Sequence, residues 1–256
     1  MGYYIPRKKL FTGTNFKEIP DVFALERVGA GHDGFVYRDG DIAYKVLKHG
    51  IDGRKEKGLM SFDKARAFQT LDVKRFIKPD DVLIDEDGIY AGYVMRYYDD
   101  LTKKQDDGTV IKNIGEFTGE DFLVSVSELS DDVSELTKKG LVIKDINRGS
   151  YIFSEDFLHI CDMDKYFLNR GQALRINWSQ LNYIVAKMMY FEKMEREGFF
   201  RDKEFANELN KRMNKWVSKC SNSSNFIRTL ENELGGSALS SPLSEFVDYT
   251  FQKVIV

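Results

Sequence analysis

The sequence predicts an α+β protein built of two lobes, a strand-rich lobe over residues 1–98 and a helix-rich lobe over residues 99–256. In the first lobe, short apolar runs alternate with Asp-Gly turns, and this pattern is typical of β-hairpins. In the second lobe, apolar residues recur three and four positions apart, as they do on one face of a helix. A polar stretch over residues 99–108 separates the two patterns and is the expected junction.

The strands of the first lobe are expected in pairs around tight turns. The predicted strands are Phe35–Tyr37, Ile42–Leu47, Asp81–Ile84 and Ile89–Tyr97, with turns at Arg38–Asp41 and Asp85–Gly88. One helix is expected over Met60–Leu71, because Ala67, Phe68 and Leu71 share one helical face.

The second lobe is expected to begin with its longest helix, over Phe117–Lys139, and Gly140 is a stop signal for that helix. Two brief strands, Tyr151–Phe153 and Leu158–Cys161, should follow it. The remaining predicted helices are Trp178–Glu197, Asp202–Cys220, Asn225–Leu234 and Pro242–Val254.

The composition limits the classes of function. The chain has 256 residues, 42% of them hydrophobic, and a net charge of −3 with only short basic clusters, so a nucleic-acid partner is not expected. The chain has no apolar run of the ~20 residues that a bilayer span needs, so no membrane association is expected. Its two cysteines are far apart and its three histidines are scattered. We expect a cytoplasmic protein with reduced thiols, and export as an effector remains open.

Three glycines follow the pattern G-x-G-x-x-G-x-V in the segment that begins at Leu25. Gly29, Gly31 and Gly34 would let backbone amides approach phosphate oxygens, and Val36 completes the pattern. The same glycines could open a dinucleotide site, but that site needs a helix directly afterwards, and here a hairpin is expected. A glycine-rich hairpin without a ligand is the remaining alternative.

A lysine on the return strand gives this hairpin its resemblance to a known family. Ala43 and Lys45 stand in the segment Ala-Tyr-Lys-Val, from which the ammonium group of Lys45 could reach back to the glycines. The hairpin resembles the nucleotide-binding hairpin of protein kinases. The resemblance implies a two-lobed protein-kinase-like fold with ATP in the cleft between the lobes, where Lys45 contacts the α- and β-phosphates.

The segment that begins at Leu141 resembles the kinase catalytic loop H-R-D-L-x-x-x-N. Asp145 falls on the catalytic aspartate, which implies that it accepts or orients the proton of the substrate hydroxyl. Ile143 and Lys144 replace the His and Arg, and Ser150 replaces the metal-binding Asn. A serine hydroxyl can still bind Mg²⁺, as it does in Walker-type sites.

The segment from Leu158 to Asp164 resembles the strand that leads into the kinase D-F-G. Asp162 then takes the role of the aspartate that holds Mg²⁺ against the phosphates, and Mn²⁺ could replace Mg²⁺. Met163 stands for the Phe and Asp164 for the Gly. Asp164 is either a helper ligand of the metal or a turn residue.

The resemblance also has implications for one strand and one helix of the first lobe. The strand around Met95 resembles the one that enters the kinase hinge, which implies that Met95 is the gatekeeper and that backbone groups of Arg96 and Tyr98 bind adenine. A plain core strand is the alternative. The kinase helix after the lysine strand carries a glutamate that pairs with the lysine, but the apolar spacing places Lys64 there, with Asp63 and Glu56 as the nearest carboxylates.

The segment Asn177-Trp178-Ser179 resembles the D-x-W-S opening of a buried kinase helix. It follows Asp162 so closely that neither an activation loop nor an A-P-E docking segment fits between them. Residues 165–177 also contain no Ser or Thr, so regulation by phosphorylation of that segment is not expected.

The expected function is that of an ATP- and Mg²⁺-dependent phosphotransferase, with protein Ser/Thr side chains as the first expected acceptors. Two alternatives remain open. The chain could be a pseudokinase or scaffold that binds nucleotide without transfer, or a small-molecule kinase of the aminoglycoside-phosphotransferase type. The expected partners are therefore ATP and either a protein or a small-molecule substrate.

Overall fold

The computed structural model describes residues 9–13, 17–31, 33–48, 60–103, 110–197, 211 and 242–250. The helices expected over Asp202–Cys220 and Asn225–Leu234 lie outside the described residues, except for Lys211, and so does Glu56.

The chain forms an α+β structure that divides into two compact units. The first unit contains residues 1–73, 77–98 and 161–167, and the second contains residues 74–76, 99–160 and 168–256. A single boundary between Tyr98 and Asp99 was predicted from the sequence. A division falls there in the structure too, but residues 74–76 belong to the second unit and residues 161–167 to the first.

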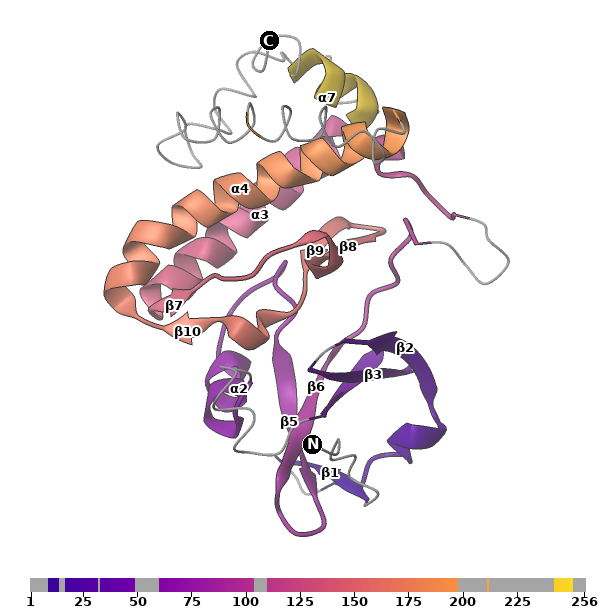
Figure 1. Cartoon of the computed structure of the whole chain (residues 1–256), viewed down its shortest axis with the longest axis vertical. Coiled ribbons are helices and arrows are strands. Elements are labelled where there is room, and N and C mark those ends of the chain that lie inside the picture. The colour runs from indigo at the N-terminus through magenta and orange to yellow at the C-terminus, as the bar shows by residue number, and fades with distance from the viewer. Residues whose placement is uncertain are drawn as a thin grey trace. The chain divides into compact units, whose positions relative to one another are not determined.

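A six-stranded antiparallel sheet forms the body of the first unit (Figure 1). The order of the strands across the sheet is β1-β5-β6-β4-β3-β2. The bounds are β1 (Leu10–Thr12), β2 (Glu26–Ala30), β3 (Gly34–Asp39), β4 (Ile42–Leu47), β5 (Pro79–Asp85) and β6 (Tyr90–Arg96). The strands predicted in this lobe are confirmed, whereas β1 and β2 were not predicted as strands.

Two glycines explain how the strands turn and approach. Gly40 has a φ of 58° in the turn between β3 and β4, a conformation that costs little without a Cβ. A Cβ on Gly34 would lie 2.6 Å from the carbonyl oxygen of Val46. Gly34 is therefore needed for the close approach of β3 and β4, whether or not a ligand binds there.

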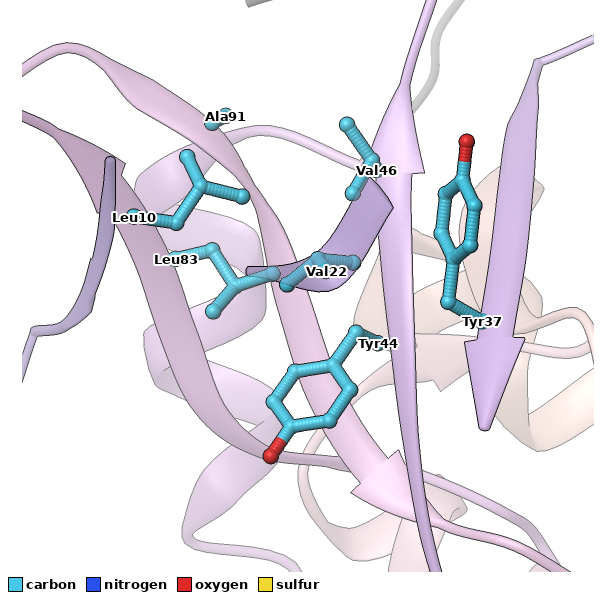
Figure 2. Close-up of a cluster of buried hydrophobic side chains, with 7 residues drawn as sticks. All are labelled: Leu10, Val22, Tyr37, Tyr44, Val46, Leu83 and Ala91. Carbon is cyan, nitrogen blue, oxygen red and sulfur yellow. The ribbon is translucent and has the colours of Figure 1, made fainter. Parts of the chain in front are cut away.

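One face of the sheet carries the hydrophobic core of the first unit. Tyr44 and Val46 of β4 point to this face together with Tyr37 of β3, because every second residue of a strand faces the same way. Figure 2 shows the complete cluster of Leu10, Val22, Tyr37, Tyr44, Val46, Leu83 and Ala91. Val22 comes from a short 3₁₀ helix, η1 (Val22–Ala24).

The helix of the first unit is α2 (Phe62–Gln69), which packs against β5 and β6. It begins after Ser61, whose side chain accepts a hydrogen bond from the backbone N–H of Lys64 at 3.2 Å. Ala65 and Phe68 are fully buried on one face. The predicted helix is confirmed, although it is shorter at both ends than the apolar pattern suggested.

Two long helices lie side by side in the second unit, α3 (Gly119–Lys138) and α4 (Arg170–Glu197) (Figure 1). A capping box of Thr118 and Asp121 fixes the start of α3. Gly140 ends it with a φ of 74°, as the sequence predicted. A Cβ at Gly140 would lie 2.5 Å from Cγ of Arg170, so this end of α3 also lies against the start of α4.

The start of α4 corrects the sequence analysis. The helix begins at Arg170 and not at Trp178, because the side chain of Asn169 accepts the backbone N–H of Gln172 at 3.0 Å and caps it. Asn177 is therefore an interior residue of α4 and not its opening. Its side chain is fully buried.

The remaining elements of the second unit are short. Strands β8 (Tyr151–Ser154) and β9 (Phe157–Ile160) pair in antiparallel fashion as predicted. The others are η2 (Ile114–Glu116), β7 (Leu141–Val142), η3 (Arg148–Ser150) and α7 (Leu243–Thr250). In the described part of the chain, no helix combines the length and the apolar character needed to cross a membrane.

Candidate functional site

The register of the sheet places several predicted nucleotide-binding residues on one face, opposite the core of Figure 2. Val36 of β3 lies opposite Lys45 of β4, and Ala43 lies opposite Met95 of β6. Gly29 of β2 lies opposite Val36. Directly opposite residues of antiparallel strands point to the same side, so these five residues share one face.

Lys45 extends from this face to two aspartates of the segment 161–167. Its Nζ lies 2.8 Å from Oδ1 of Asp162 and also bonds to Oδ2 of Asp164. The lysine and Asp162 are 117 positions apart in the sequence. The structure therefore joins two residues that the sequence analysis had selected separately. Asp162 stays 42% exposed in its side chain, but Asp164 is only 1% exposed.

Asp164 is the centre of this cluster and is not merely a turn residue. Its Oδ1 accepts the hydroxyl of Tyr93 at 2.9 Å, while its Oδ2 accepts Lys45. It lies in the 3₁₀ helix η4 (Met163–Lys165). The buried carboxylate that neutralises Lys45 thus comes from η4. In α2, Lys64 occupies the position where the kinase resemblance implies a glutamate, and its neighbour Asp63 is exposed.

Lys64 also contacts Asp164, at its main chain. Its Nζ donates a hydrogen bond to the main-chain carbonyl oxygen of Asp164. Asp164 therefore accepts hydrogen bonds from two lysines, one at its side chain and one at its backbone. Burial lowers the pKa of Lys64 to about 8, although the charge of Asp164 acts in the opposite direction.

The charges of the cluster shift one another. Burial alone would lower the pKa of Lys45, but Tyr93, Asp164 and Asp162 outweigh it and hold that pKa well above its usual value. Burial would raise the pKa of Asp162, but Lys45 lowers it overall. Burial raises the pKa of Asp164, and the charge of Asp162 raises it further. Asp162 is accordingly the more readily ionised member of the pair.

The glycine segment forms the hairpin between β2 and β3. The N–H of Gly31 donates to the carbonyl of Gly34 at 3.0 Å, and Nζ of Lys48 donates to the carbonyl of Gly31 at 2.6 Å. A Cβ on Gly31 would meet no atom within 4 Å, so packing does not require a glycine there. His32 lies outside the described residues.

The predicted hinge residues lie at the end of β6. Met95 is half-buried and Arg96 is exposed, with the guanidinium of Arg96 5.0 Å from the ring centroid of Tyr98. The N–H of Tyr97 donates to the carbonyl of Asp41 at 2.8 Å, which ties the segment after β6 to the β3–β4 turn. Met95 shares the face of Lys45, so its side chain is placed to contact a ligand bound there.

Asp145 and Ser150 belong to the second unit. Asp145 is exposed, whereas Ser150 is 1% exposed and its Oγ accepts the N–H of Asn147 at 3.2 Å. Asn177 of α4 fixes the start of this loop, because its Oδ1 accepts the N–H of Ile143 at 2.9 Å and its Nδ2 donates to the carbonyl of Leu141 at 2.7 Å.

The two selected aspartates share a backbone conformation that is uncommon for residues other than glycine. Among the described non-glycine residues, only Asp145, Phe157 and Asp162 have a positive φ, with values of 63°, 81° and 70°. Such conformations cost ~1–3 kcal/mol and are frequent at functional sites, where they direct a side chain.

Three members of the site were not predicted from the sequence. Tyr93 was not selected, although it stands two positions before Met95 and therefore on the same face of β6. The role of Asp164 was left open, and Lys64 was regarded only as the residue that replaces the kinase glutamate. No local signal in the sequence indicates that Asp164 is buried against β4 and β6.

Comparisons of the sequence with protein-family models and with curated proteins find no match. Among the described residues, no three His, Cys, Asp or Glu side chains are grouped so as to hold a metal ion. The function is therefore inferred from the side chains of the site.

Proposed function

We propose that the protein is an ATP-dependent phosphotransferase with a two-lobed, protein-kinase-like architecture. The observation that carries the proposal is the 2.8 Å bond between Lys45 and Asp162 on the sheet face that also bears Val36 and Met95. A buried ammonium group beside a partly exposed carboxylate can bind a polyphosphate and its metal ion together.

Lys45 binds the phosphate chain in this proposal. The phosphate oxygens compete with Asp162 and Asp164 for its ammonium group, which the cluster keeps protonated over the physiological range. Val36 and Met95 are partly exposed apolar residues on the same sheet face as the buried Ala43, and the adenine base can pack against this face. The binding groups of the nucleotide thus come from β3, β4 and β6.

Asp162 would hold the metal ion, which would supply charge neutralisation at the transferred phosphoryl group. The donor chemistry fits, because a carboxylate oxygen is a preferred ligand of Mg²⁺ and this side chain is partly exposed. Ser150 does not fit the role of second ligand, because its hydroxyl is buried and already accepts a backbone hydrogen bond. We therefore assign the metal to Asp162 without Ser150.

Asp145 receives or orients the proton of the acceptor hydroxyl. It is exposed and stands on a backbone with positive φ, and Asn177 anchors the start of its loop. Positioning of this kind contributes most of the rate in phosphoryl transfer, which needs little covalent chemistry from the protein.

The segment after Asp162 bears on the class of acceptor. Only residues 163–169 separate Asp162 from α4, and this stretch is largely occupied by η4 and the short strand β10 (Phe167–Leu168). A peptide-docking platform of the usual kind does not fit in so short a segment. A small hydroxyl compound is thus a strong second candidate beside a protein Ser or Thr side chain.

The direct experiment is incubation with ATP and Mg²⁺ or Mn²⁺, followed by mass measurement of the protein and of added protein and small-alcohol acceptors. We expect phosphate transfer by the parent, none by Asp162→Asn and none by Asp145→Asn. Asp72→Asn is the matched control because Asp72 is exposed and outside the site. If the parent transfers phosphate to none of the acceptors with either metal, the proposed enzymatic activity is refuted.

The engaged hydroxyl of Ser150 favours one other function, nucleotide binding without transfer. That protein would be stabilised by ATP, because a ligand of the folded state raises the unfolding temperature. Stabilisation that is lost in Lys45→Met but kept in Asp145→Asn, together with no transfer by the parent, would identify such a pseudokinase.

A further inference from the structure

Two lysines meet at one residue of the site. Asp164 accepts the ammonium group of Lys45 at its carboxylate and that of Lys64 at its main-chain carbonyl. We propose that Lys64 is a second phosphate-binding group, which together with Lys45 grips the phosphate chain of the nucleotide. The inference rests on the proposed function. It adds Lys64 to the phosphate-binding residues and implies that nucleotide binding depends less on the metal ion.

The position of Lys64 is fixed by local structure. Its backbone N–H is held by the cap residue Ser61, so the residue stands in the first turn of α2. Its Nζ lies 5.8 Å from the ring centroid of Phe68, a buried residue one turn further on. The ammonium group of Lys64 is thereby directed to the cluster, whereas Arg66 on the same helix is exposed.

The charge at this position has the opposite sign from the one that the kinase resemblance implies. A glutamate in α2 would pair with Lys45 and repel phosphate, whereas Lys64 attracts it. The carboxylate that Lys45 needs comes from Asp164 instead. The helix is therefore free to contribute a cation to phosphate binding.

Lys64 stands in a cluster of mixed charge. The other charged and titratable groups of this cluster include Lys45 from β4, Tyr90 and Tyr93 from β6, and Asp162, Asp164 and Lys165 from the segment 161–167. Burial works against the charge of Lys64, whose pKa falls to about 8. A phosphate oxygen beside this amine would restore its proton, because an adjacent negative charge favours the protonated form.

The test measures binding of ATP and of inorganic tripolyphosphate by titration calorimetry, with Mg²⁺ and with EDTA. We expect Lys64→Met to lower the affinity for both ligands about tenfold or more, because a charge-assisted hydrogen bond is lost. The loss should be clearest in EDTA. Lys64→Arg should retain most of the affinity. Arg66→Met removes the same charge two positions along the helix and should change little.

A second readout separates contact with phosphate from a structural role. At a pH between about 8 and 9, binding should take up protons in the parent, since Lys64 becomes protonated in the complex. Titrations in buffers of different ionisation enthalpy measure this uptake, which Lys64→Met should reduce and Arg66→Met should not. Thermal unfolding of each variant checks whether the folded state persists.

The outcomes distinguish this inference from the proposed function. Equal affinity and equal proton uptake in the parent and in Lys64→Met would overturn the role of Lys64 and leave the phosphotransferase standing. If the parent binds tripolyphosphate but not ATP, and Lys64→Met loses this binding, the phosphate-binding role of Lys64 is supported and the nucleotide site is overturned. Binding of neither ligand by the parent would overturn both.

Discussion

Asp164 is the residue on which the cluster depends. It is buried, and its carboxylate is bonded to Lys45 and to the hydroxyl of Tyr93. Removal of one member of a buried ion pair leaves the other charge without compensation, which costs far more than the pair contributes when intact. The side chain of Asp162, at the exposed side of the same cluster, should be more tolerant of substitution.

We predict that Asp164→Asn lowers the free energy of unfolding by about 3–5 kcal/mol, the usual result of breaking a buried pair. Asp162→Asn should cost much less, because its side chain is 42% exposed. Urea denaturation of the two variants measures the difference. Equal losses for the two would show that burial does not distinguish the carboxylates.

Tyr93 donates a hydrogen bond to Asp164, and its substitution should destabilise the protein less than that of Asp164. Tyr93→Phe removes one hydrogen bond and leaves the ring in place, so we predict a loss of ~1–2 kcal/mol in unfolding free energy. The same denaturation experiment measures it. A loss as large as that of Asp164→Asn would mean that the hydroxyl, and not Lys45, holds the carboxylate.

At the scale of elements, α3 fixes residues 74–76, the segment between α2 and β5 that belongs to the second unit. Asp132 accepts the backbone N–H groups of Lys74, Arg75 and Phe76 at 2.9, 2.6 and 3.1 Å. Arg75 in turn pairs with Glu128, one turn earlier in α3. A helical carboxylate with backbone partners thus explains why this short segment leaves the first unit.

We predict that Asp132→Asn lowers the unfolding free energy by at least about 1–3 kcal/mol, because a neutral amide offers one oxygen to three backbone donors, two of them buried. Asp131→Asn is the matched control, since Asp131 is the exposed neighbour on the same helix. Amide hydrogen exchange should also show faster exchange at residues 74–76 in Asp132→Asn alone. Unchanged exchange there would contradict the role of α3.

At the scale of the whole molecule, the proposed chemistry draws on both units. Lys45, Asp162 and Asp164 lie within the first unit, because the segment 161–167 belongs to it. Asp145, with its loop and the anchoring residue Asn177, lies in the second. Phosphate binding and proton acceptance are therefore assigned to separate units of the chain.

This division predicts a separation of binding from transfer. Asp145→Asn should abolish phosphate transfer and leave the dissociation constant of ATP within about twofold of the parent, because no phosphate-binding group changes. Lys45→Met should weaken ATP binding instead. Calorimetric titration and the transfer assay on the same preparations check both statements. A large loss of ATP affinity in Asp145→Asn would contradict the assignment.

The sequence predicted the regular elements better than the site. The hairpin of β3 and β4 was predicted because its turn residues and apolar alternation are local signals, and α3 was predicted because its period runs over many residues. The start of α4 was placed wrongly because the cap at Asn169 is a single polar residue before a weakly periodic stretch. The strand β2 was obscured by Gly29 within it and by the glycine-rich turn that follows.

The sequence by itself determined the α+β composition, the hairpin that carries Lys45, and the selection of Lys45, Asp145 and Asp162 as chemical candidates. Only the tertiary structure decided that Lys45 meets Asp162 and that Asp164 is the buried partner of both Lys45 and Tyr93. The physical reason is distance along the chain. Local spacing fixes which face of a strand a residue occupies, but the packing of residues 161–167 against β4 and β6 decides which charges are buried together.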